Sequence, residues 1–178
     1  VCLSNLKQIG VGIYTFSATE KGKLPGGLWW GQEARYNQNS GSFGRYLATI
    51  MGKDEPTSTT EVMDVMLCPS FTTSISGASA EQTKQFKAHG KDGDNNRYFG
   101  YPAFDGADPK APRTMTVVED PSEENAICEL DSIIQGNTST WNGDMSLTPR
   151  HGMKGGSGNR TMLFFDGHGL ISTKQPQD

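Results

Sequence analysis

Histidine and carboxylate side chains near the C-terminus are the residue types best suited to holding a metal ion. His151, Asp166 and His168 offer two imidazoles and a carboxylate, which suit zinc and other divalent cations. The structural alternative is that Asp166 caps a turn, His168 lies at an exposed tip and His151 bonds a backbone group. A hydrolytic metal centre would also need an open coordination position with an acid or base nearby, and the sequence marks neither. The structural alternative is therefore preferred.

A second candidate metal site is an Asx-rich stretch in the middle of the chain. Asp92, Asp94 and Asn96 place oxygen ligands at alternate positions, as calcium loops do. The pattern then departs from an EF-hand, because Arg97 stands where Gly is needed and Ala103 where the bidentate Glu is needed. A solvated turn is the preferred interpretation, and a calcium site is the alternative.

Residues for nucleophilic or phosphate chemistry do not form a recognisable pattern. There is no Gly-x-Ser-x-Gly elbow, and the three histidines have no spacing that pairs one with a cysteine. The Gly-rich stretch 152–158 lacks the Gly-Lys-Ser/Thr ending that a phosphate loop requires. The sequence therefore predicts a protein that is not an enzyme.

Aromatic residues in or near loops could stack on the faces of sugar rings. These residues are Trp29, Trp30, Trp141, Tyr36 and Tyr101. Packing in the core is the preferred alternative, since the chain is short of aliphatic residues. Trp29 and Trp30 are adjacent, and neighbouring residues of a strand point to opposite sides, so one is expected in the core and the other exposed or covered by a loop.

Size and composition indicate one loop-rich domain. The chain has 178 residues, of which 34% are hydrophobic, 22 are Gly and 9 are Pro, and its mean hydropathy is −0.56. The net charge of −4 and the scattered Lys and Arg residues argue against a nucleic-acid partner. No run of eighteen apolar residues is present to span a bilayer.

The first twenty residues predict an amphipathic helix. Apolar positions recur every three or four residues, at Leu3, Leu6, Ile9 or Gly10, Ile13 and Phe16. Of these, Leu3, Leu6, Ile13 and Phe16 are expected to pack the helix against a sheet. Gly22, preceded by a lysine, marks the end of this helix. No capping residue precedes the first apolar position, and we therefore expect the helix to begin further upstream in a longer protein.

Further elements follow from local patterns. A short second helix is expected over 43–52, an apolar run over 62–67 leads into Cys68-Pro69-Ser70, and 71–91 resembles an excursion over the surface. Asp166-Gly167 predicts a tight turn between two short strands, 161–165 and 170–173. The remaining expected strands are 98–104, 113–119 and 125–130.

Three segments together resemble a known family. CLSNLKQIGVGIYTFSATEKGKLP, the Cys-Pro-Ser tripeptide with the later YFGYPAF, and a C-terminal His before Asp-Gly are similar to type IV pilin-like proteins. The closest resemblance is to the pseudopilin-like family with a prepilin-type cleavage and methylation signal. In that family roughly nine residues separate the His from the Asp-Gly, whereas fourteen (152–165) lie between His151 and Asp166 here. Gly155-Gly156-Ser157-Gly158 resembles an inserted loop.

This resemblance implies a pilin-like α+β fold in which the N-terminal helix packs on an antiparallel sheet with long surface loops. Residues 1–20 would be the C-terminal half of the pilin helix and 21–178 a loop-rich head in one domain. The family also implies an upstream membrane helix, anchorage in the inner membrane, and a head that faces the periplasm or the cell exterior. The expected partners are other pilin-like subunits and the secretion or pilus assembly machinery, with no nucleic acid.

The expected function is therefore that of a structural subunit of a pseudopilus or type IV pilus-like assembly. The alternative is a surface-exposed module that binds polysaccharide through its loop aromatics. Major pseudopilins of type II secretion carry a calcium loop, which keeps the calcium alternative open. The three cysteines leave two interpretations open as well. Either all three are small buried residues, or one disulfide forms, which the implied location permits and for which Cys2–Cys68 is the expected pairing.

Overall fold

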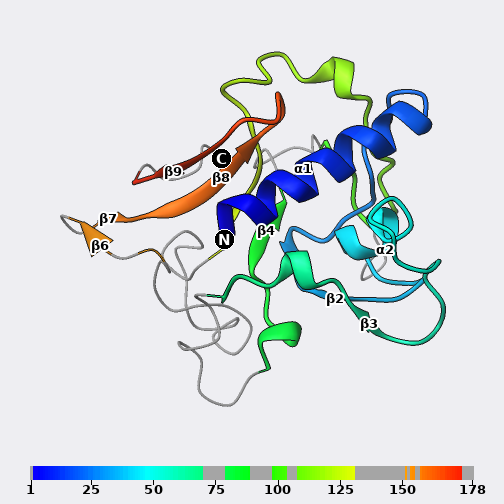
Figure 1. The fold of residues 1–178 in the computed structure, drawn as a ribbon. Helices are drawn as coiled ribbons and strands as arrows, with labels where there is room; N and C mark the ends of the chain where they lie inside the picture. Colours follow the sequence, from blue (N-terminus) through cyan, green and yellow to red (C-terminus); the bar gives the residue numbers. More distant parts are fainter. Residues whose placement is uncertain are drawn as a thin grey trace.

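A long helix, α1 (Cys2–Thr19), lies across an antiparallel sheet in the computed structural model of the protein (Figure 1). The structure describes residues 2–69, 79–88, 98–103, 108–130, 151, 153–154 and 157–173. In this part of the chain α1 contacts two neighbouring strands of the sheet on one side and short helical segments on the other. The arrangement belongs to the general α+β class that the sequence predicts.

The sheet has five strands in the order β1-β4-β5-β8-β9, and every neighbouring pair is antiparallel. Two smaller antiparallel pairs, β2 with β3 and β6 with β7, lie outside it. The strands are β1 (Gly31–Gln32), β2 (Arg35–Tyr36), β3 (Glu61–Val62), β4 (Phe86–Ala88), β5 (Asn125–Glu129), β6 (Met153–Lys154), β7 (Ser157–Gly158), β8 (Arg160–Phe164) and β9 (Gly169–Ser172).

The apolar stripe of α1 forms the centre of the core. Leu6, Ile9 and Ile13 are buried, and the backbone of Gly10 approaches β8 closely. A Cβ atom at Gly10 would stand 3.0 Å from Cδ2 of Leu163, a strand residue with only 1% of its surface exposed. The missing side chain therefore lets the helix lie directly on the sheet.

The two end residues of the predicted stripe lie at the margins of this contact. Leu3 is half-buried, and its Cδ1 atom would be 2.9 Å from a Cβ placed on Gly169 of β9. Phe16 packs edge-to-face against Tyr46 of α2 (Phe43–Leu47), with ring centroids 6.1 Å apart. The stripe thus covers β8 and β9 with its first part and reaches a second helix with its last residue.

The end of α1 follows the sequence signals. Lys21 and Gly22 have positive φ angles of 54° and 85°, and the Gly22 N–H donates to the Ser17 carbonyl at 2.7 Å. This hydrogen bond satisfies one of the carbonyl groups left unpaired in the last helical turn. The C-terminal hairpin is also confirmed, because β8 and β9 pair across a turn in which Gly167 has a φ of 87°.

The segment 71–91, expected to run over the surface, contributes a strand to the sheet. Its described part holds a short 3-10 helix, η3 (Ala80–Gln82), and then β4, which pairs with β1 on one side and β5 on the other. Phe86 and Ala88 are 0% and 3% exposed. A strand of three residues is too short for its alternation to be distinguished from a loop, so the sequence-based expectation was wrong here.

The predictions of two other strands are also wrong. The described parts of 98–104 and 113–119 contain only isolated bridges, Tyr101 with Lys110 and Thr114 with Lys23, and the second segment then turns into η4 (Met115–Val117). Gly100 has a φ of 65°, which turns the backbone out of an extended course. In contrast, the strand expected over 125–130 is β5.

The second helix is shorter than the segment 43–52 expected for it. Helix α2 ends at Leu47, and the chain turns until Gly52, whose φ is 76°. The run before Cys68 consists of β3 and the 3-10 helix η1 (Asp64–Met66), which contacts α1.

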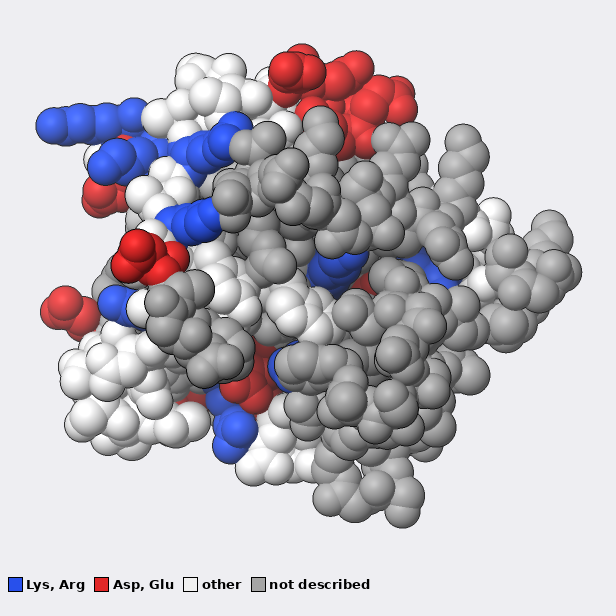
Figure 2. Space-filling model, turned by 180° about the vertical axis from the view of Figure 1, so that it is seen from behind, with Lys and Arg blue, Asp and Glu red and all other residues white. Residues whose placement is uncertain are grey.

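The described surface has charges of both signs. Figure 2 shows one group of acidic side chains at an edge of the back face, and further acidic and basic side chains scattered over the rest of it. None of the helices in the described ranges combines the length and apolarity needed to cross a membrane.

Candidate functional site

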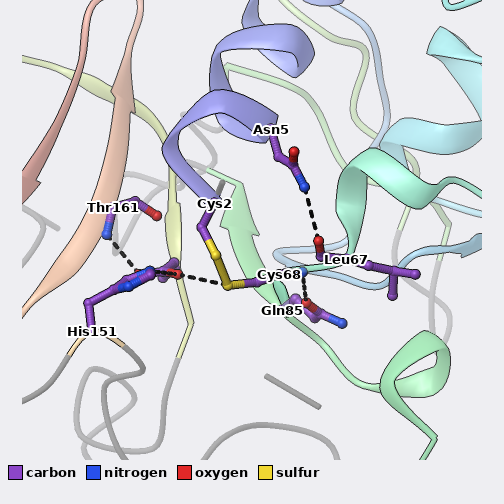
Figure 3. The surroundings of a disulfide bond; sticks show 8 residues. Cys2, Asn5, Leu67, Cys68, Gln85, His151 and Thr161 are labelled. Atoms are coloured by element: carbon purple, nitrogen blue, oxygen red, sulfur yellow. Dashed lines mark hydrogen bonds and ion pairs between the residues drawn. A yellow bond between two sulfur atoms is a disulfide. The ribbon is translucent and has the colours of Figure 1, made fainter. Parts of the chain in front are cut away.

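Four metal-ligating side chains from distant parts of the chain meet beside the first turn of α1. Their ligand atoms all lie within 4.8 Å of one another. Two of the residues, Cys2 and Cys68, form a disulfide that joins α1 to the segment after η1 (Figure 3). The four residues are Cys2, Cys68, Glu129 and His151.

The helix stripe and a set of buried hydrogen bonds position the two cysteines. Cys2 continues the buried face of α1 toward its beginning and is 3% exposed. The Cys68 N–H donates to the side-chain oxygen of Gln85 at 2.7 Å, and Asn5 of α1 donates to the Leu67 carbonyl at 3.0 Å. Independently of the disulfide, the Asn5 bond holds this segment against α1 and the Gln85 bond holds it beside the start of β4. Of the two interpretations left open by the sequence, the structure has the one with a disulfide, in the expected pairing Cys2–Cys68.

Glu129 is a buried carboxylate at the end of β5, with 2% of its side chain exposed. One oxygen, Oε2, accepts the backbone N–H of Thr161 in β8 at 2.7 Å. The other, Oε1, lies 2.9 Å from Nε2 of His151 and 3.6 Å from Sγ of Cys68. The sulfur carries no hydrogen while the disulfide is formed, so this last distance is a contact and not a hydrogen bond. Both oxygens are thus in use, as burial of a carboxylate requires.

His151 completes the cluster from the stretch before β6. Its ring is partly exposed, with 22% of the side chain accessible, and its backbone carbonyl accepts a hydrogen bond from Asn159 at 3.1 Å. The imidazole and the carboxylate form an ion pair when the ring is protonated. A disulfide, a carboxylate and an imidazole therefore share one small volume under the helix.

The structure separates this histidine from the other members of its sequence motif. Asp166 and His168 lie in the turn after β8, whereas Thr161 at the start of that strand touches the Glu129 cluster. Five residues of extended chain correspond to about 16 Å. A metal site made from His151, Asp166 and His168 is therefore wrong, because β8 holds them at opposite ends.

At the hairpin turn the Asp166 carboxylate organises the backbone. It accepts the His168 N–H at 3.0 Å, and its Oδ1 lies 2.6 Å from Nδ1 of the His168 ring. The ring stacks on Phe164 with centroids 4.2 Å apart. Burial alone would raise the pKa of Asp166, but the hydrogen bonds from His168 outweigh it and lower that pKa. Gly167 supplies the positive φ angle, so these motif residues form a turn.

Aromatic residues form a second concave site, at the β1 edge of the sheet. A pocket of about 450 Å³ is lined by Trp29, Trp30, Tyr101 and Lys84, among others. The rings of Trp29 and Tyr101 meet edge-to-face with centroids 5.0 Å apart, and Lys84 Nζ lies 5.9 Å from the centroid of the Trp30 ring. Both tryptophans are half-buried, so the expectation that one lies in the core was wrong. Tyr36 is in the core instead and bonds Glu61.

Several sequence-based candidates lie outside the described residues: Trp141 and the calcium candidates Asp92, Asp94 and Asn96.

Two residues of the sites, Glu129 and Lys84, were not predicted from the sequence. The signal that could have pointed to Glu129 is that it directly follows the apolar run Ala126-Ile127-Cys128, which is expected to be buried. Lys84 had none.

Comparison with known proteins assigns no relative: no family model, curated protein or solved structure matches the chain.

Proposed function

We propose that this protein is a structural subunit of a pilin-like envelope assembly of the type II secretion or type IV pilus kind. The observation that carries the proposal is the way α1 is fastened to the sheet. Its buried stripe lies on β8 and β9, and the Cys2–Cys68 disulfide ties its first turn to the rest of the domain. A subunit held in an assembly through its helix must keep its head attached when neighbours pull on it, and a covalent bond at this point resists such separation.

The described surface offers apolar groups through which copies could contact one another. β9 is the last strand of the sheet, so one of its edges has no strand partner in the described part of the chain. Repeated contacts between two different patches of one subunit generate an open helical filament. The exposed apolar side chains on α1 and β9 are Val11, Tyr14, Leu170 and Ile171, with 67%, 39%, 36% and 55% of their surface exposed.

The first test is mass spectrometry of the full-length gene product in its native membrane. The proposal predicts that a short leader is removed and that the new N-terminus, ahead of a hydrophobic helix, is methylated. An ordinary secretory signal cleaved near Val1 would remove the anchor through which assembly is proposed, and the proposal would then be wrong.

A variant tests the contact surface itself. Ile171→Asp should abolish chemical cross-linking of one subunit to the next while leaving the helical circular dichroism unchanged, because it places a charge on an exposed edge strand. Val117→Asp is the matched control, since it makes the same change at a residue of η4 that is 41% exposed. Equal loss of cross-links in both variants, or in neither, would contradict a role for β9.

The aromatic pocket favours a second candidate, a binding module on the same scaffold that recognises polysaccharide. Half-buried tryptophans around a cavity of about 450 Å³ suit stacking against sugar rings. A glycan panel monitored by tryptophan fluorescence tests it: binding should be lost in Trp30→Ala and kept in Leu170→Ala, which alters the opposite edge of the sheet. No binding to any glycan, or binding that survives Trp30→Ala, would reject the module.

A further inference from the structure

We propose that the disulfide cluster under α1 becomes a binding site for a divalent cation of the zinc class when the disulfide is reduced. The oxidised and metal-bound states would exclude each other. A sulfur engaged in an S–S bond is no thiolate, and the thiolate is the form that binds a metal. The four ligands of the reduced site are Cys2, Cys68, Glu129 and His151.

The donor set has the composition that zinc prefers. Structural and catalytic zinc sites use cysteine sulfur, histidine nitrogen and carboxylate oxygen, usually four in number. In a tetrahedral site with usual bond lengths, neighbouring ligand atoms are roughly 3.3 to 3.8 Å apart. Here Oε1 of Glu129 is 2.9 Å from Nε2 of His151 and 3.6 Å from Sγ of Cys68, and all four ligand atoms fall within 4.8 Å. Small side-chain rotations are sufficient to centre a metal ion among them.

The ligands are held in place by contacts that do not depend on the S–S bond. Cys2 is part of the buried stripe of α1, and the Cys68 backbone is bonded to Gln85. Glu129 belongs to β5, and its Oε2 is occupied by the Thr161 N–H, which leaves Oε1 directed toward the other ligands. Such supporting hydrogen bonds orient metal ligands and strengthen binding. The cluster should therefore persist after reduction.

The redox step balances with an external reductant, either a dithiol or a trialkylphosphine. The disulfide accepts two electrons and two protons, the S–S bond breaks, and Cys2 and Cys68 become thiols. The dithiol is oxidised to its own disulfide, or the phosphine to its oxide with oxygen and protons from water. Metal binding then displaces the two thiol protons to solvent. Since the metal binds only the reduced form, a metal concentration of 100 times its Kd raises the ratio of reduced to oxidised protein about 100-fold.

Cobalt(II) is the most informative probe, because its spectrum reports both thiolate ligation and geometry. The 178-residue protein should be reduced anaerobically with a phosphine, desalted and titrated with Co²⁺, and the oxidised protein should be titrated in parallel. We expect one Co²⁺ per chain with a thiolate-to-cobalt charge-transfer band and tetrahedral d–d bands in the reduced sample alone. Zinc should displace the cobalt and slow reoxidation by a thiol oxidant.

Four variants separate this site from unspecific binding. Glu129→Gln and His151→Asn each remove a ligand and should weaken Co²⁺ binding at least tenfold. His168→Asn is the matched control, because that histidine also pairs with a carboxylate but lies at the other end of β8. Cys128→Ser is the thiol control, since Cys128 is in no disulfide. Both controls should bind as the wild-type protein does.

Three results would overturn the proposal. They are reduced protein without a charge-transfer band, equal Co²⁺ binding by oxidised protein, and undiminished binding in both Glu129→Gln and His151→Asn. If reduction unfolds the protein, helical circular dichroism replaces the titration as the readout. Recovery of the helical signal on adding Zn²⁺ would then support the site, and failure to recover it would reject the site.

Discussion

Reduction of the Cys2–Cys68 disulfide should lower the free energy of unfolding by about 4 kcal/mol. The perturbation is minimal, because the phosphine is oxidised with oxygen from water while each sulfur gains one hydrogen, and no side chain is removed. The bond closes a loop between residues 66 apart in the sequence. Opening that loop returns conformational freedom mainly to the unfolded chain, while the native contacts of both residues remain.

The magnitude follows from the length of the loop. For a sequence separation of 66, the chain-entropy relation gives about 15 cal/mol/K, which is about 4 kcal/mol at 25 °C. Domains of this size are usually stable by about 5 to 15 kcal/mol, so we expect the reduced protein to remain folded at this temperature. With a urea m-value of about 2 to 3 kcal/mol/M, the midpoint of unfolding should fall by about 1 to 2 M.

The assay is urea unfolding followed by helical circular dichroism, on oxidised and phosphine-reduced protein with a chelator present. The chelator matters because a bound metal would stabilise the reduced form. Cys128→Ser provides the control: its stability can change, but the difference between its oxidised and reduced forms should equal that of the wild type. A midpoint shift below about 0.3 M, which is under about 1 kcal/mol, would refute the loop-closure reasoning.

Three further perturbations have expected outcomes. Gly10→Val should destabilise the protein by about 1 to 3 kcal/mol in urea unfolding, because a Cβ already comes within 3.0 Å of Leu163; an unchanged midpoint would contradict direct contact of α1 with β8. Tyr36→Phe should cost about 1 to 2 kcal/mol by removing the hydrogen bond to Glu61. Burial, aided by that hydrogen bond, raises the pKa of Tyr36 to about 12, so its stabilisation is complete below pH 10 and is lost as the pH rises toward 12. Ultraviolet titration should show one fewer late-titrating tyrosine in the variant, and an identical titration would refute the assignment. Asp166→Asn should reduce the loss of stability on acidification. The pKa of Asp166 is lowered in the folded protein, so its carboxylate stabilises the fold above the usual carboxyl pKa, and this stabilisation is lost as the pH falls through the folded value. An equal loss of unfolding free energy between pH 6 and pH 3 in the wild type and the variant would contradict this.

Local signals were sufficient for the elements whose pattern is long or chemically distinctive. The stripe of α1 repeats over four turns, and its burial follows from that repeat. The C-terminal hairpin could be predicted because Asp-Gly provides both the carboxylate and the positive φ angle that the turn uses. In each case the information lies within about twenty neighbouring residues.

Short strands could not be predicted from the sequence because their stability comes from their neighbours. β4 has three residues and is a strand only because β1 and β5 pair with both of its edges. The opposite error occurred at 113–119, where alternation alone predicted a strand. There the Met115 N–H donates to the carbonyl of Gly22, three residues beyond the end of α1, and the chain forms the 3-10 helix η4. Strand formation is a property of pairs, which alternation in one segment does not reveal.

The candidate site also combines features that local sequence sets with features that only the fold sets. The sequence by itself determined that α1 exists, that Leu6 and Ile13 lie on its apolar face, and that Asp166 and Gly167 form a turn. Only the tertiary structure decided that Glu129 lies against the disulfide and that His151 joins it while Asp166 and His168 do not. The physical reason is that helix and turn preferences act between near neighbours, whereas the meeting of residues 2, 68, 129 and 151 depends on the order and register of strands in the sheet.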